Sequence, residues 1–193
     1  NKESLFELAQ VFAHFGFIDD AKEIAERLLL DSPEETTFRI FLSECLMELN
    51  YEDEAIDQLQ QIDQHDDHYL QAQLLMADIY QTQGLEEVAE QKLLEAADHN
   101  SNEPILMYAL AEFYLAQGSS YKAIPYYERC IENPGDEIPI EELHLHYAEA
   151  LSLNGEFEKA LTYYEEASFQ SLAIDQLFKY GVTAFEAKEW HKA

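Results

Sequence analysis

Histidine and carboxylate side chains are the residues of this sequence that could bind a metal ion or transfer protons. His65 and His68 flank two aspartates in the stretch QHDDHY, and His144 and His146 lie two positions apart in LHLH. Side chains two apart on a helix point to different faces, so His144 and His146 would make a poor chelate. The HDDH stretch is expected to be solvated at a junction between helices. We therefore predict no metal site, and no cysteine–histidine spacing of the zinc type is present.

Catalysis is also not expected from this sequence. The 40 Asp and Glu residues could act as acids or bases, but such chemistry needs carboxylates held together in a sheltered pocket. The sequence contains no glycine-rich phosphate loop, nucleophile elbow or HExxH stretch. We expect no enzyme and no cofactor, with the remote alternative that the chain is the non-catalytic part of a longer enzyme.

The charge balance limits the classes of partner that the chain is expected to bind. The chain has 193 residues with 11 Lys and Arg against 40 Asp and Glu, a formal net charge of −29. Such a surface repels phosphates, which argues against binding of nucleic acid or anionic lipid. It favours a basic or partly apolar partner, although solubility alone is an equally weighted reason for the acidity.

Neither membrane insertion nor secretion is expected. No apolar run reaches the roughly 18 residues of a membrane helix, and the start NKESLFELAQ has no signal-peptide pattern. The chain has two cysteines, Cys45 and Cys130, each inside a helical pattern. They are expected to be small buried hydrophobes, which points to a reducing compartment and a cytoplasmic location.

The elements that carry these residues repeat along the chain. A small residue recurs where each second helix of a pair should open, with separations of 34, 34, 34, 37 and 33: Ala21, Ala55, Ala89, Ala123, Ala160 and Ala193. A residue that tolerates positive φ precedes each of them at the expected turn: Gly16, Asn50, Gly84, Gly118, Gly155 and, less comfortably, Lys188. The junction NPGDEIP accounts for the longer interval.

Apolar residues at helical spacing then predict an all-α chain of helix pairs. The expected pairs are 2–15 with 18–31, 35–49 with 52–63, 68–83 with 86–99, 103–117 with 120–132, and 139–154 with 157–169, followed by a helix at 172–187. One array would fill residues 1–193, with repeats at about 2–35, 36–69, 70–103, 104–140 and 141–173 and a partial repeat at 174–193. One helix pair cannot bury its apolar face alone, so stability must come from stacking.

The repeats resemble those of the tetratricopeptide repeat family, whose unit has 34 residues. The fourth repeat carries the pattern best, with Leu110, Ala111, Tyr114, Gly118, Ala123 and Tyr127. The chain also resembles long acidic proteins of this family from low-GC Gram-positive bacteria. The resemblance implies a right-handed superhelical α-solenoid of about five and a half helix-turn-helix repeats, whose first helices line a concave groove.

The family geometry implies which residues face that groove. An apolar series on the first helices comprises Phe6, Ile40, Leu74, Tyr108, Leu145 and Phe178. Four residues later, on the same helical faces, lie Gln10, Glu44, Asp78, Glu112, Glu149 and Val182. An apolar row beside a carboxylate row would hold a basic or amphipathic segment of a partner protein. The alternative for any one apolar member is that it packs against neighbouring helices.

Two functions from different classes remain open. The first is a protein-interaction scaffold that uses the groove. The second is a structural or assembly module that acts through the ends of the array, as a homodimer or larger complex, with the helix at 172–187 and its residues Leu177, Phe178 and Phe185 as the contact. Because the last first-type helix is left without a cover, we expect either a longer array or closure by another copy. The sequence identifies neither the partner nor the process.

Overall fold

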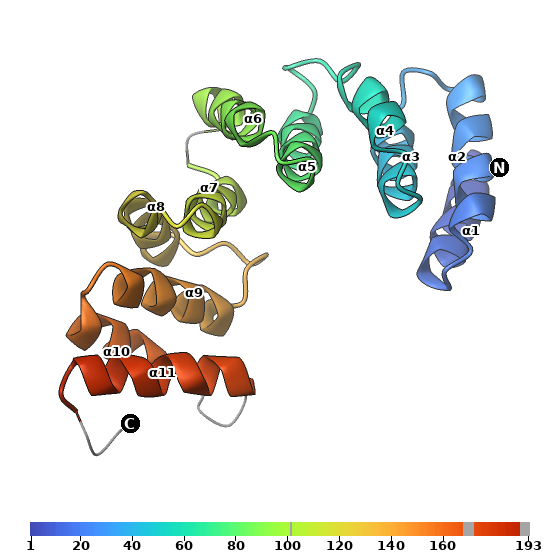
Figure 1. The fold of residues 1–193 in the computed structure, drawn as a ribbon. Helices are drawn as coiled ribbons and strands as arrows, with labels where there is room; N and C mark the ends of the chain where they lie inside the picture. Colours follow the sequence, from blue (N-terminus) through green and yellow to red (C-terminus); the bar gives the residue numbers. More distant parts are fainter. Residues whose placement is uncertain (101, 168–171, 190–193) are drawn as a thin grey trace. The chain divides into compact units, whose positions relative to one another are not determined.

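The computed structural model of this chain describes residues 1–100, 102–167 and 172–189. Within those ranges the chain forms eleven α-helices and no strand, which confirms the all-α prediction. The helices divide into two compact units, unit 1 (Asn1–His99) and unit 2 (Asn100–Ala193) (Figure 1). Among the described residues, no helix combines the length and the apolar character needed to cross a bilayer.

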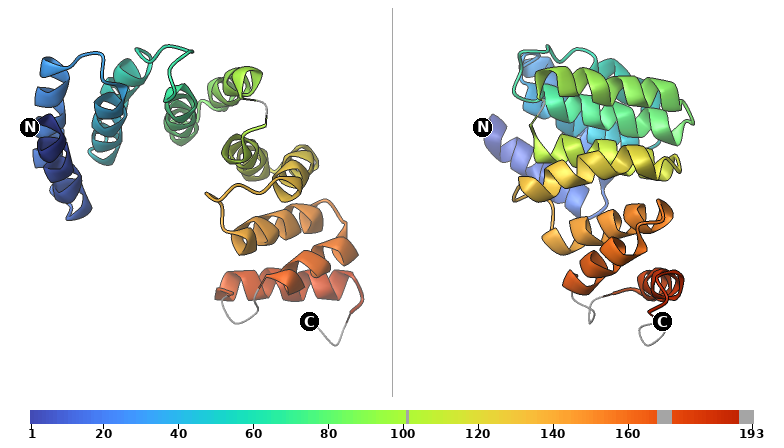
Figure 2. Two further views of the ribbon diagram at one scale, coloured as in Figure 1. Left: turned by 180° about the vertical axis from the view of Figure 1, so that it is seen from behind. Right: turned by 90° about the vertical axis from the view of Figure 1, so that its left-hand side faces the viewer.

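Unit 1 is a stack of three helix pairs. Its helices are α1 (Lys2–His14), α2 (Ile18–Asp31), α3 (Thr36–Glu48), α4 (Glu52–Leu59), α5 (Tyr69–Thr82) and α6 (Glu86–His99). Each first helix packs on the second helix of its own pair, and α2 and α4 pack on the first helix that follows (Figure 2). The first helices α3 and α5 also touch. The side chain of Asn1 caps α1 by accepting a hydrogen bond of 3.2 Å from the backbone N–H of Glu3.

Unit 2 repeats this arrangement with two pairs and a final first-type helix. Its helices are α7 (Pro104–Ala116), α8 (Ser120–Glu132), α9 (Ile140–Leu153), α10 (Phe157–Glu166) and α11 (Ile174–Glu186). Pro104 opens α7, where a missing N–H costs nothing, whereas Pro125 lies inside α8 as expected. The first helix α9 touches both α7 and α11, so three first helices adjoin one another in this unit.

Small residues allow the helices of a pair to approach closely. The alanines predicted to open the second helices, Ala21, Ala55, Ala89, Ala123 and Ala160, are all 0% exposed. Their partners on the first helices are equally inaccessible, as Ala9, Ala111 and Ala148 show. Large side chains fill the space around them, with Tyr127 and Tyr147 among the largest fully buried residues. The predicted Ala193 lies outside the described residues.

The turns between paired helices have one local design. All predicted turn residues have positive φ, from 61° to 84°: Gly16, Asn50, Gly84, Gly118, Gly155 and Lys188. After each one, a backbone N–H bonds back to the carbonyl five residues earlier, as in the 2.8 Å bond from Ser119 N to Tyr114 O. The left-handed conformation is costly for Lys188, since only glycine adopts it without strain.

The predicted end of α4 was wrong by four residues, because α4 ends at Leu59 and not at 63. The aspartates that follow offer the backbone other hydrogen bonds. Asp63 Oδ1 accepts from His65 N at 2.9 Å, and Asp66 Oδ1 accepts from His68 N at 2.8 Å. Such local bonds compete with helix propagation. The predicted end of α10 at 169 lies outside the described residues.

Both cysteines are buried, as the sequence predicted. Cys45 on α3 is 3% exposed and Cys130 on α8 is 0% exposed, and neither is in a disulfide. Burial raises the pKa of each thiol to about 11. Unit 1 and unit 2 therefore each contain one protonated thiol inside the core.

Candidate partner-binding surface

The groove residues predicted for unit 1 lie on α1, α3 and α5, but they are not equally accessible. Gln10 and Asp78 are exposed, and Glu44 and Leu74 are half-buried. Ile40 is only 4% exposed and belongs to the core between α3, α4 and α5. Phe6 packs at ring-centroid distances of 5.0 Å and 5.3 Å on two phenylalanines of α3, Phe38 and Phe41. The predicted residues of unit 1 therefore do not form a regular apolar row beside a regular carboxylate row.

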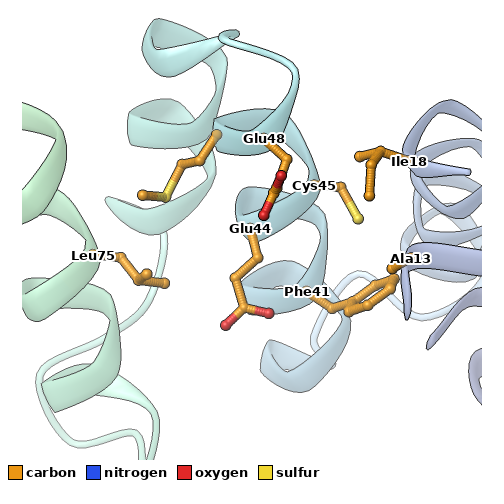
Figure 3. A pocket seen from close by; sticks show the side chains of 8 residues that line it. Ala13, Ile18, Phe41, Glu44, Cys45, Glu48 and Leu75 are labelled. Atoms are coloured by element: carbon orange, nitrogen blue, oxygen red, sulfur yellow. The ribbon is translucent and has the colours of Figure 1, made fainter. Parts of the chain in front are cut away.

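A pocket opens beside α3, and we call it the α3 pocket. It has a volume of about 680 Å³ and is lined by Ala13, Ile18, Phe41, Glu44, Cys45, Met47, Glu48 and Leu75. Figure 3 shows Phe41 and Cys45 directed toward Ala13 and Ile18, with Leu75 of α5 on the opposite side. The carboxylates of Glu44 and Glu48, one helical turn apart, lie between these apolar walls. The pocket joins an apolar lining to two acidic groups.

Glu44 is held in position by a neutral partner. Gln71 Nε2 on α5 donates to Glu44 Oε1 at 3.2 Å. Burial raises the pKa of Glu44, and the hydrogen bond from Gln71 opposes that shift only in part. A cation placed in the pocket would favour the charged carboxylate and would itself be attracted to it.

In unit 2 the predicted groove residues take part in a cluster that joins α7, α8 and α9. We call it the α7–α9 cluster, and its members are Tyr108, Glu112, Tyr127, Glu142 and His146. His146 Nδ1 lies 2.7 Å from Glu112 Oε1, which also accepts a hydrogen bond from the Tyr127 hydroxyl. The Tyr108 hydroxyl lies 2.8 Å from His146 Nδ1 and donates to Glu142 Oε1 at 3.1 Å. The Tyr108 ring stacks on His146 at 5.9 Å.

The second groove carboxylate of unit 2 is also paired. Lys179 Nζ on α11 donates to Glu149 Oε2 on α9 at 2.7 Å. Leu145 is half-buried, whereas Phe178 on α11 is 70% exposed. His146 and Lys179 were not predicted as partners of these glutamates. The sequence does place a basic residue about one repeat after each of these glutamates, on the next first helix. That spacing could have indicated the two pairs.

We expect the α7–α9 cluster to make the stability of unit 2 depend on pH. The hydrogen bond to Glu112 raises the pKa of His146 above 6.5, against desolvation, and the charges of Glu112, Glu142 and Glu149 act in the same direction. Because the folded pKa is raised, the stabilisation is complete below about pH 6.5 and is lost as pH rises through the folded pKa. We expect unit 2 to melt at a lower temperature above that pKa, as followed by circular dichroism.

Two histidine variants test this pH dependence. His146→Gln should flatten the pH profile of the melting temperature between pH 6 and 8, within the range where histidine titrates. His65→Gln, at an exposed position of unit 1, is the matched control and should leave the profile unchanged. An unchanged profile for His146→Gln would contradict the assignment.

Among the residues that the structure describes, the other histidines do not gather into a ligand set. His144 Nδ1 lies 3.4 Å from a Glu166 carboxylate oxygen, whereas His146 contacts Glu112, so the two point apart as their spacing indicated. His68 Nδ1 lies 3.0 Å from the Thr36 hydroxyl and 3.2 Å from Asp66. Across residues 1–100, 102–167 and 172–189, no three His, Cys, Asp or Glu side chains are grouped to hold a metal ion.

Helix α11 carries an exposed apolar face. Leu177, Phe178, Gly181, Val182 and Phe185 line a hollow of about 400 Å³ on it. In the preceding pairs, residues equivalent to Gly181, such as Ala111 and Ala148, are fully buried under a second helix. Phe178 and Val182 on the same face occupy the positions of Leu145 and Glu149 on α9, which are half-buried.

Stacked helix pairs whose first helices share an accessible surface define the class of helical-repeat proteins. Sequence comparison narrows this class. The family profile described as YpiA-like, tetratricopeptide repeats, matches residues 81–134, and that of the tetratricopeptide repeat protein 21 ARM repeat matches residues 2–87. The chain belongs to the tetratricopeptide repeat family, which confirms the resemblance noted in its residues.

A curated relative supports this membership. The TPR repeat-containing protein YpiA of Bacillus subtilis (strain 168) is 38% identical over 179 residues. The match covers 93% of this chain and 42% of YpiA, so the chain spans about two-fifths of the length of that relative. The relative agrees with the predicted likeness to proteins of low-GC Gram-positive bacteria.

Solved structures confirm the fold. YrrB, described as a TPR protein with an unusual peptide-binding site, aligns with a TM-score of 0.68 at 17% identity, over 87% of this chain and 86% of YrrB. PilF of Pseudomonas aeruginosa aligns with a TM-score of 0.78 at 18% identity, over 100% of this chain and 86% of PilF. At these identities the likeness establishes a tetratricopeptide solenoid and nothing finer.

Proposed function

We propose that this chain is a protein-interaction scaffold that holds a basic or amphipathic segment of a partner protein against its first helices. The observation that carries the proposal is the α3 pocket, in which apolar walls meet the carboxylates of Glu44 and Glu48. Amphipathic segments are bound in this way, with apolar anchors in a groove and charges at its edge. The net charge of −29 adds a long-range attraction for basic partners.

The proposed scaffold role involves no catalysis. Tetratricopeptide proteins are generally scaffolds that bind other proteins, and a peptide-binding site is described for YrrB. Glu44 is bonded to the neutral amide of Gln71, and Asp78 is exposed on α5, so these two carboxylates do not form a sheltered acid–base pair. The two unpaired cysteines fit the reducing conditions of the cytoplasm, which remains our proposed location.

The second candidate is assembly through the exposed apolar face of α11. It is favoured by α11, where Phe178 is 70% exposed and Val182 is 44% exposed. Exposed apolar patches of this kind mark contacts with other proteins. Another copy of the chain, or a further helix, would cover the face.

Capture of partners from a lysate of the source cells at low and high salt distinguishes the two functions. Wild type is compared with the variant Glu44→Lys/Asp78→Lys and with the control Glu23→Lys/Glu54→Lys, whose sites are exposed on α2 and α4. Groove binding predicts a salt-sensitive partner that is lost only with the first variant. A partner retained by both variants would place the site elsewhere, and a dimer in sedimentation would favour assembly through α11.

A further inference from the structure

The carboxylates of the two units have different roles. We infer that recognition of a cationic side chain is confined to unit 1, where the α3 pocket takes a large apolar side chain beside a Lys or Arg of the bound segment. The equivalent carboxylates of unit 2 hold that unit's own helices together. This inference rests on the proposed function and makes it specific.

In unit 1 the first-helix carboxylates have no basic partner. Among the described residues, the hydrogen-bond donor to Glu44 is the neutral amide of Gln71, at 3.2 Å. Within the described part of the chain, no Lys, Arg or His forms an ion pair with Glu44, Glu48 or Asp78. With no such partner to neutralise them, these carboxylates can attract a cation that arrives with a ligand.

In unit 2 the corresponding positions are occupied by internal contacts. Glu112 lies 2.7 Å from His146 and accepts from Tyr127, and Glu149 is paired with Lys179 at 2.7 Å. A ligand cation would have to displace these charge-assisted hydrogen bonds, which are roughly twice as strong as neutral ones. Their replacement would also separate first helices that they join, namely α7 from α9 and α9 from α11. Unit 2 therefore offers little net gain to a basic ligand.

The lining of the α3 pocket indicates which kind of side chain of the bound segment lies beside the cation. Its volume of about 680 Å³ falls in the usual range of ligand sites, about 300–1,000 Å³. Most of its lining is apolar, with Phe41 and Leu75 as its large side chains near Glu44. A ligand with a charge but no apolar group would leave these walls in water. The best occupant is a large apolar residue whose neighbour is Lys or Arg.

The test uses the full chain and labelled model peptides, with binding measured by fluorescence anisotropy. A leucine–lysine amphipathic peptide carries both features, a serine–lysine peptide carries the charge alone, and a leucine–glutamate peptide carries the opposite charge. Three variants remove equal charge: Glu44→Gln/Glu48→Gln at the pocket, Glu112→Gln/Glu149→Gln in unit 2, and Glu23→Gln/Glu54→Gln on the outer helices. Circular dichroism verifies that each variant is folded.

The leucine–lysine peptide should bind wild type, and the pocket variant should weaken this binding about tenfold. The unit 2 variant and the outer control should change it by less than about twofold, and the other two peptides should bind far more weakly. Equal weakening by the unit 2 variant or by the control would overturn confinement to unit 1. Tight binding of the serine–lysine peptide would overturn the apolar anchor. No binding of the leucine–lysine peptide would overturn the proposed function itself.

Discussion

Replacement of Tyr127 by alanine is expected to destabilise unit 2 by about 3–5 kcal/mol, the usual cost of removing a buried aromatic side chain. Tyr127 is 0% exposed, and its ring lies 6.0 Å from that of Tyr147 on α9. Its hydroxyl donates to Glu112, so the change also removes a donor from the α7–α9 cluster. Hydrogen exchange of the full chain should show loss of protection in α7, α8 and α9.

Two further variants separate the contribution of the Tyr127 hydroxyl from that of its buried ring. Tyr127→Phe keeps the ring and removes only the hydroxyl, so it should cost about 1.5–3 kcal/mol, the range for a hydrogen bond to a charged group. Tyr121→Ala lies on the same helix at a position 65% exposed, and its effect should stay within about 0.5 kcal/mol. Similar losses from Tyr121→Ala and Tyr127→Ala would contradict the buried placement of Tyr127.

The second large effect is expected in unit 1, where Leu28→Ala should cost about 2–5 kcal/mol. Leu28 on α2 is 1% exposed, so its removal leaves a cavity inside the stack. Chemical denaturation of the full chain, with exchange protection in α1 to α3 as the local readout, measures the loss.

Leu30→Ala is the matched control, because it makes the same chemical change two residues further along the same helix. Leu30 is 83% exposed, so its replacement should change stability by no more than about 0.5 kcal/mol. Because helix propensity changes equally in both variants, the difference between them reports burial alone. Equal effects at the two positions would show that the orientation of α2 is wrong.

The sequence predicted the repeat architecture because its signals are local. A left-handed turn needs a tolerant residue at one position, and the turns at Gly118 and Asn50 were placed correctly from that requirement. Close packing of paired helices needs a small residue, and Ala55 and Ala123 are fully buried as predicted. Even Lys188, an uncomfortable residue for positive φ, has a φ of 63° at the expected turn.

The roles of individual groove residues were harder to predict, because they depend on contacts between repeats. Ile40 occupies a groove position of the pattern, yet it is buried by its neighbours at 4% exposure. Glu112 and Glu149 follow the same spacing as Glu44, but within the described part of the chain they pair with a basic residue on the next first helix and Glu44 does not. The partner of Glu112 is His146, whose offset of 34 residues differs from the 37-residue interval between Ala123 and Ala160. Helical periodicity within one repeat carries no information about such pairs.

The two buried thiols make the chain its own reporter of local opening. A reagent that reacts with thiolates should modify Cys45 or Cys130 slowly before local opening, because the two residues are 3% and 0% exposed and burial raises the pKa of each thiol to about 11. Each unit contains one of them, so the modification of each cysteine, followed by mass spectrometry, measures the opening of its own unit. The natural sequence therefore allows the kinetics of both halves to be compared in one sample, without an introduced label.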